Sequence, residues 1–160
     1  MSVYPRLVTG IAVITGSRPA AEDAVQEALA RAWERSEHGG RIDHLQAWVT
    51  TVAINLARSW LRRVVAERRA RDRLRAGATE SSAEELSADR IDVLRAVREL
   101  PRRQREAIVL RYYLGMNVHE TAIALGIADG TAKATLYRAR EVLAGRLGEK
   151  ALEEANERDH

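Results

Sequence analysis

Residues 120–143 read ETAIALGIADGTAKATLYRAREVL, and this stretch decides the fold. Its spacing predicts one helix that ends before Gly126 and a second that runs from about Gly130 to Leu147. Gly126 stands where a tight turn requires the left-handed backbone conformation that glycine adopts without strain. We expect Asp129 to cap the second helix through its side-chain oxygen. Two helices joined in this way form a helix-turn-helix.

The second helix of this pair has an apolar and a polar side. The side chains expected to pack between the two helices are Leu125, Ile127, Ala132, Leu136 and Ala139. The outer face is predicted to carry Thr131, Lys133, Ala134, Tyr137 and Arg138. A DNA major groove admits one α-helix, whose N-terminal half reaches the base edges, so this outer face is a candidate DNA-binding surface. The alternative is a helical hairpin within a bundle, whose basic face is only solvated.

The composition excludes several classes of protein. The chain of 160 residues contains no Cys, which rules out disulfides, thiol catalysis and thiolate metal sites and favours a reducing cytoplasm. No apolar run approaches the ~18 residues that span a bilayer, so we expect no membrane insertion. The four His show no metal-ligand spacing, and no Gly-rich phosphate loop occurs. The sequence therefore indicates a cytoplasmic protein that is not an enzyme and uses no cofactor or metal.

The N-terminal part predicts two helices that share a core. A short helix places Leu7, Ile11 and Ile14 at helical spacing and ends at Gly16. The apolar stripe expected of the next helix consists of Val25, Ala28, Leu29, Ala32 and Trp33. Its other faces carry Asp23, Gln26, Glu27 and Arg31. Periodicity alone favours an ordinary solvated face for these four polar residues.

A longer helix is expected from about Asp43 to Arg75, after a loop at about 36–44. The side chains predicted to face inward are Leu45, Trp48, Val49, Val52, Leu56, Trp60 and Leu61. The opposite face is predicted to hold Asn55, Arg58, Ser59, Arg62 and Arg63. Arg neutralises phosphates, and both Arg and Asn address base edges, so this strip is a candidate nucleic-acid surface. The alternative is again a solvated helix face.

Charge is distributed in blocks along the chain. Residues 57–76 contain eight Arg against Glu67 and Asp72, a local net charge of +6. Residues 77–92 contain five acids against Arg90, a local net charge of −4. Such blocks suggest a surface that binds a polyanion, flanked by acidic connectors.

These observations predict an all-α fold of two small helical domains. The segment between them is small, polar, acidic and without periodicity, which is typical of a flexible linker. The predicted divisions are a helical bundle at 1–75, the linker at 76–89, a helix-turn-helix domain at 90–147 and an acidic tail at 148–160.

Several short motifs follow one another in a fixed order. In the C-terminal half they are Leu100-Pro101, Gln104-Arg105, Glu120, Leu125-Gly126-Ile127, Gly130-Thr131, Lys133 and Arg138-Ala139-Arg140. This order resembles region four of bacterial RNA polymerase sigma factors, most closely the extracytoplasmic-function group of the sigma-70 family. SRPAAEDAVQEALARAWE (17–34) and LQAWVTTVAINLARSWLRR (45–63) are similar to region two of the same group. Together the two resemblances cover residues 4–65 and 90–147.

The resemblance implies a promoter-specificity factor whose partners are core RNA polymerase, promoter DNA and an anti-sigma factor. It implies that Asp23, Gln26, Glu27 and Arg31 dock on the polymerase clamp. It assigns the strip on the long helix to the downstream promoter element and the loop at 36–44 to the capture of an unstacked base. It assigns the outer face of the last helix to the upstream element.

The chain departs from the family pattern in the last helix. Ala132, Ala134 and Thr135 stand where Val, Ser and Arg are usual, so we expect weak binding to the upstream element. The family normally has another helical turn or two before Tyr4, so we expect either that the start of this sequence is late or that the first helix is trimmed. Two rival functions are a stand-alone regulator that uses only the helix-turn-helix, and a decoy that occupies polymerase without reading DNA. The clamp-like helix argues against the first rival.

Overall fold

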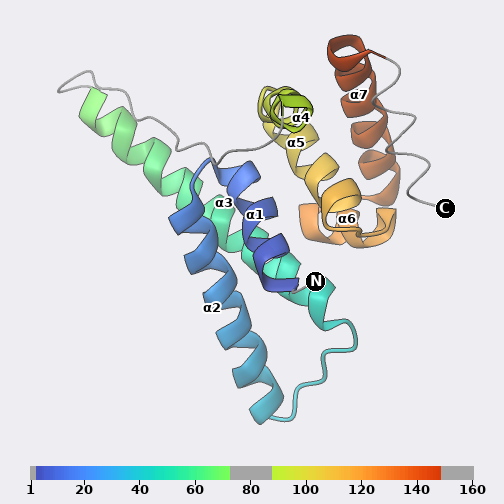
Figure 1. Cartoon of the computed structure of the whole chain (residues 1–160). Helices are drawn as coiled ribbons and strands as arrows, with labels where there is room; N and C mark the ends of the chain where they lie inside the picture. Colours follow the sequence, from blue (N-terminus) through green and yellow to red (C-terminus); the bar gives the residue numbers. More distant parts are fainter. Residues whose placement is uncertain (1–2, 73–87, 149–160) are drawn as a thin grey trace. The chain divides into compact units, whose positions relative to one another are not determined.

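A computed structural model of the chain describes residues 3–72 and 88–148. All regular elements in these two ranges are helices, which confirms the predicted all-α class. The chain divides into two compact units, residues 1–84 and 85–160 (Figure 1). Within the described ranges, no helix is both long enough and apolar enough to cross a membrane.

Three helices form the first unit: α1 (Val3–Thr15), α2 (Arg18–Glu37) and α3 (Leu45–Asp72). Local sequence sets the boundary between the first two. Gly16 adopts a φ of +70°, and the Ser17 side chain caps α2 by accepting a hydrogen bond of 3.3 Å from the amide of Ala20. Each helix packs against the other two, so the unit is a three-helix bundle (Figure 1).

Small side chains dominate the buried face of α2. It consists of Ala20, Ala21, Ala24, Val25, Ala28 and Ala32. The predicted burial of Leu29 and Trp33 is wrong, because these residues are 41% and 68% exposed. Ala28 and Ala32 stand three and seven residues after Val25, and Leu29 and Trp33 stand four and eight residues after it. Helical spacing alone therefore does not decide which of the two pairs is buried. The small alanine side chains allow closer helix packing, and α2 buries them in place of Leu29 and Trp33.

The buried face of α3 is also rotated from the predicted one. It contains Val49, Thr50, Ala53, Ile54, Ala57 and Arg58. Leu45, which was predicted to face inward, is 54% exposed, whereas Arg58, which was predicted on the open face, is only 8% exposed. Trp48, Val52, Leu56, Trp60 and Leu61 are half-buried at the flanks. Again the small side chains lie where the helices approach most closely.

The second unit contains α4 (Ala88–Arg98), α5 (Arg102–Ile108), a π-helical turn η1 (Val109–Tyr113), α6 (Val118–Leu125) and α7 (Asp129–Leu147). Pro101, with a ψ of 143°, separates α4 from α5. The wider turn of η1 appears in the bond of 2.9 Å from the amide of Leu114 to the carbonyl of Val109. The core of the second unit includes Leu110, Leu114, Met116, Ala122, Leu125, Ala132, Leu136, Ala139 and Leu143.

The described residues include only part of the predicted domain boundaries. Ala88 and Asp89, assigned to the linker, begin α4. The predicted end of the long helix at Arg75, the rest of the linker and the tail after Gly148 lie outside the described residues.

Candidate protein and nucleic-acid interfaces

The turn between α6 and α7 is built from local sequence. Asn117 caps α6 by accepting from the amide of Glu120, and the Glu120 carboxylate accepts from the amide of Asn117, both at 2.8 Å. Gly126 ends α6 in the left-handed region, at φ 66° and ψ 39°, as predicted. The next amide, of Ile127, returns to the carbonyl of Ala122 at 3.0 Å. The chain is thereby turned into α7 within a few residues.

Asp129 does not cap α7, so that prediction is wrong. The cap residue is Ala128, which provides no side-chain bond, and Asp129 is the first helical residue. Its carboxylate instead meets the imidazole of His119, with Nδ1 at 3.1 Å and 3.2 Å from the two oxygens. The reason is geometric: the turn brings the first turn of α6 beside the start of α7.

The outer face of α7 is open, as the sequence predicts. Its exposed residues are Thr131, Lys133, Ala134, Tyr137 and Arg138. Tyr137 is 59% exposed, whereas Ala132, Leu136 and Ala139 on the other side are at most 4% exposed. Thr135 adds no donor to this face, because its hydroxyl donates to the carbonyl of Thr131 at 2.8 Å. Two cations and one phenol are therefore the long polar side chains on this face.

A buried carboxylate connects α5 to the helix-turn-helix. Glu106 is fully buried, and its carboxylate accepts from Arg102 Nε at 3.0 Å. Arg103 lies 3.9 Å from the same carboxylate and donates to the carbonyl of Leu125, the last residue of α6, at 3.1 Å. Burial lowers the pKa of the Arg105 guanidinium, and the carboxylate of Glu106 opposes this shift. The cluster fixes the end of α6, from which the turn and α7 follow.

The second candidate surface lies on α2. Asp23, Gln26, Glu27 and Arg31 are all exposed there. Arg31 Nε donates to Glu27 at 2.8 Å, and Gln26 contacts the hydroxyl of Tyr4 at 3.5 Å. The exposed Leu29 and Trp33 lie on the same helix, one turn apart. Sequence reasoning missed them as surface residues, although the run of alanines at 21, 24, 28 and 32 is the signal that could have revealed them.

The predicted strip on α3 is divided by the structure. Asn55, Arg62 and Arg63 are exposed and Ser59 is half-buried, whereas Arg58 is buried and donates to Asn55 Oδ1 at 3.4 Å. Arg62 donates to the hydroxyl of Ser59 at 2.8 Å. Beyond Leu61, α3 continues without close packing, and its arginines there are exposed. The accessible part of the strip therefore consists of Asn55, Arg62 and Arg63.

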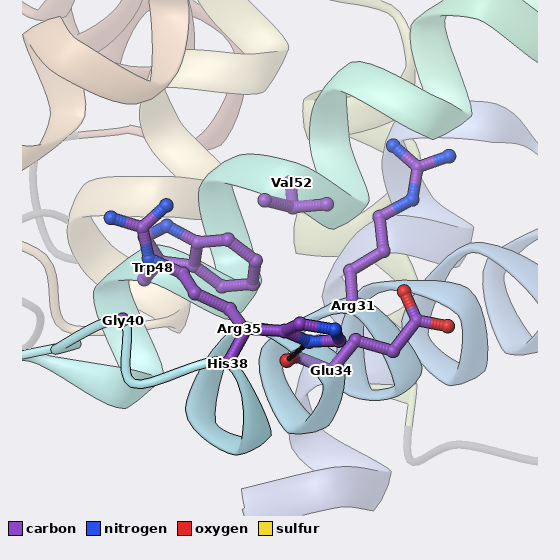
Figure 2. A pocket seen from close by; sticks show the side chains of 7 residues that line it. All are labelled: Arg31, Glu34, Arg35, His38, Gly40, Trp48 and Val52. Carbon is purple, nitrogen blue, oxygen red and sulfur yellow. Dashed lines mark hydrogen bonds between the residues drawn. The ribbon is translucent and has the colours of Figure 1, made fainter.

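An open groove lies between the end of α2 and the start of α3 (Figure 2). Its volume is about 580 Å³, and it is lined by Arg31, Glu34, Arg35, His38, Gly40, Trp48 and Val52. His38 holds the end of α2 through a contact of 2.7 Å between Nδ1 and the carbonyl of Glu34. The half-buried Trp48, predicted to face inward, lies at the groove wall. Aromatic, cationic and polar groups thus meet in one open cavity.

In the parts of the chain that the structure describes, no group of three His, Cys, Asp or Glu side chains could hold a metal ion. The comparisons with known proteins bear on the two helical units instead. The family described as Sigma-70 region 2 matches residues 1–69, and the family described as Sigma-70, region 4 matches residues 90–143.

Curated relatives and solved structures agree with this match. The chain is 36% identical over 141 residues to the ECF RNA polymerase sigma factor SigL of Mycobacterium tuberculosis, covering 81% of this chain and 76% of the relative. It is 35% identical over 141 residues to the RNA polymerase sigma-E factor of Streptomyces coelicolor, covering 83% and 77%. The sigma factor RpoE of Bartonella quintana, solved with the anti-sigma factor NepR, superposes with a TM-score of 0.74 at 30% identity over 92% of both chains.

The chain belongs to the sigma-70 family, in its extracytoplasmic-function group. It is a promoter-specificity factor of RNA polymerase. The region 2 match includes the α2 surface, the groove and most of α3, and the region 4 match includes the helix-turn-helix. The buried Arg58 and Glu106 of this sigma factor lie within the matched regions but are not surface residues.

Proposed function

We propose that this sigma factor docks on core RNA polymerase through the exposed face of α2. The observation that carries this proposal is the pairing of Leu29 and Trp33, two large apolar side chains in solvent, with the charged residues Asp23, Glu27 and Arg31 on one helix. Tight protein interfaces commonly have an apolar aromatic centre with a polar rim. This face therefore extends the predicted docking set by two residues.

Promoter DNA would contact the first unit at α3 and at the groove beside it. Arg62 and Arg63 supply cations for phosphates of the downstream element, and the exposed Asn55 supplies an amide that can address a base edge. The groove carries Trp48 as a surface on which an unstacked base can pack, with Arg35 and His38 at its rim. Capture of one base there would favour the opened promoter.

In the second unit, α7 would read the upstream element. Lys133 and Arg138 are its exposed cations, Tyr137 is its exposed aromatic residue, and Thr131 and Ala134 complete the face. Because so few long donors project, we expect this contact to be weak in isolation. Polymerase, held by α2, would keep α7 near the DNA.

The regulation that we propose follows from the exposed apolar surface. RpoE was solved in complex with the anti-sigma factor NepR, and this chain shares its fold at 30% identity. An anti-sigma factor that covers Leu29 and Trp33 would block polymerase binding. The protein would act in the cytoplasm, without catalysing a reaction and without a cofactor.

A run-off transcription assay with core RNA polymerase tests the function directly. The full chain should direct initiation from a subset of genomic promoter fragments that core enzyme alone does not use. Reversal of charge at Asp23 and Glu27 together should abolish run-off and weaken capture of core enzyme, while leaving the helical content unchanged. Glu67→Lys on α3 is the control, because it reverses an exposed acidic charge on another helix.

Each rival function predicts a different result. A stand-alone regulator would bind DNA but fail to capture core enzyme. A decoy would capture core enzyme but produce no run-off at any promoter. Unchanged capture by the folded Asp23 and Glu27 variant would refute the assignment of the docking face.

A further inference from the structure

An ion-pair geometry joins the two helices of the helix-turn-helix at their N-terminal ends. His119 lies in the first turn of α6, and Asp129 is the first residue of α7. The imidazole Nδ1 lies 3.1 Å and 3.2 Å from the two carboxylate oxygens. Both side chains remain open to solvent, with 70% and 53% of their surface exposed.

The position of this pair matters because of what approaches it. In a helix-turn-helix the first helix crosses the DNA backbone, and the N-terminal part of the second enters the major groove. Asp129 therefore places a negative charge at the end of α7 that comes nearest to phosphates. At physiological salt, charges interact over ~8 Å, so an uncompensated carboxylate there opposes docking.

Three charged groups on the elements around this pair have partners of their own, and a fourth, Lys133, lies on the exposed face of α7. On α6, the carboxylate of Glu120 accepts from the amide of Asn117 at 2.8 Å. From η1, Arg111 donates to the carbonyl of Met116 at 3.3 Å, and on α5 the buried Glu106 is held by arginines of the same helix. On α7, Lys133 stands one turn after Asp129 on the exposed face.

We propose that His119 neutralises Asp129 when α7 docks on DNA, and that the imidazolium is the form that binds the promoter. This inference rests on the proposed reading of the upstream element by α7. His119 acts as a positioning residue for the recognition helix, without contacting a base.

A double-mutant cycle on the complete sigma factor, bound to core polymerase, tests the inference. The measured quantity is the affinity of each holoenzyme for a promoter fragment. We expect His119→Ala to weaken binding by about two- to five-fold, the range of an exposed ion pair. In an Asp129→Asn background, the same change should have a clearly smaller effect, because no carboxylate is left to neutralise.

The pH dependence supplies a readout that damage to the fold would not produce. Imidazoles change charge between about pH 5 and pH 8, so the advantage of wild type over His119→Ala should grow as the pH falls through that range. His119→Lys, which keeps its charge, should bind equally well at both ends of the range. Dividing the affinity of wild type by that of His119→Ala at each pH removes any pH effect of the polymerase itself.

Two results would overturn the inference. One is an equal loss from His119→Ala with and without Asp129, which would indicate a direct phosphate contact or a folding defect. The other is no loss at any pH. Lys133→Ala distinguishes these failures from a failure of the proposed function, because it should weaken promoter binding in every background if α7 reads DNA. If Lys133→Ala also has no effect, the reading by α7 is wrong.

Discussion

Replacing Arg62 and Arg63 together by Ala should reduce the salt dependence of promoter binding, whereas Arg58→Ala should reduce the stability of the first unit. The structure separates residues that lie close together in the sequence. Arg62 and Arg63 are exposed, and Arg58 is 8% exposed with a hydrogen bond to Asn55. Only an exposed guanidinium can contact a DNA phosphate and release the counterions condensed on the DNA there.

The expected size follows from the number of cations. Each phosphate contact contributes ~0.7–0.9 to the slope of log affinity against log salt, so the double variant should lose about 1.4–1.8. Over a four-fold rise in salt, from about 50 to about 200 mM, wild type should therefore lose about 7- to 12-fold more affinity than the variant. Arg58→Ala should leave this slope unchanged and lower the free energy of unfolding by ~1–3 kcal/mol, because it removes a buried side chain from the bundle together with its hydrogen bond to Asn55.

The assay is a titration of labelled promoter DNA with reconstituted holoenzyme at several salt concentrations. Arg68→Ala is the control, because at ~100° a residue it lies about 120° from Arg62 and about 140° from Arg63 around α3. Thermal unfolding of the full chain measures the effect of Arg58→Ala. The reasoning is refuted if the double variant keeps the full slope, or if Arg68→Ala lowers the slope as much as either arginine of the pair.

Three further predictions concern other parts of the molecule. Trp33→Ala should weaken capture of core polymerase by ~2 kcal/mol or more without changing the melting temperature, since the side chain is 68% exposed; an equal effect of Val65→Ala, on the last turns of α3, would argue against a specific docking site. Gly126→Val should destabilise the second unit by ~1–3 kcal/mol in thermal unfolding, because its φ of 66° strains a β-branched residue; retention of wild-type stability would contradict this. Glu106→Gln should lower stability by ~1–3 kcal/mol through loss of the charged partner of Arg102, and unchanged unfolding would show that the buried pair is not stabilising.

The helix-turn-helix could be predicted because its determinants are local. A glycine at the turn, small residues where the helices cross and polar residues outward are all readable within about 25 residues of sequence. The capping box of Asn117 and Glu120 was equally readable, but no prediction used it. The assignment of Asp129 as a cap failed by one position, because Ala128 is the cap residue and Asp129 is the first residue of α7.

The buried polar residues could not be predicted from spacing. Glu106 stands in a helix rich in Arg, where a solvated carboxylate is the ordinary expectation. Its complete burial depends on arginines that reach it from its own helix while α6 and α7 pack around them. Arg58 is similar, since its position relative to the core depends on how far α3 is rotated against α1 and α2.

The orientation of α2 likewise explains why Leu29 and Trp33 were misplaced, and it bears on their role. Full burial of a large apolar side chain contributes ~1.5–3 kcal/mol, so a bundle selected for stability alone would be expected to turn Leu29 and Trp33 inward. In this bundle α2 places Ala28 and Ala32 inside and the larger neighbours in solvent. The apolar surface thereby withheld from folding remains available for association. A partner that covers it gains the transfer free energy of the part still exposed, 41% of Leu29 and 68% of Trp33, which is the physical basis for the proposal that polymerase docks on α2.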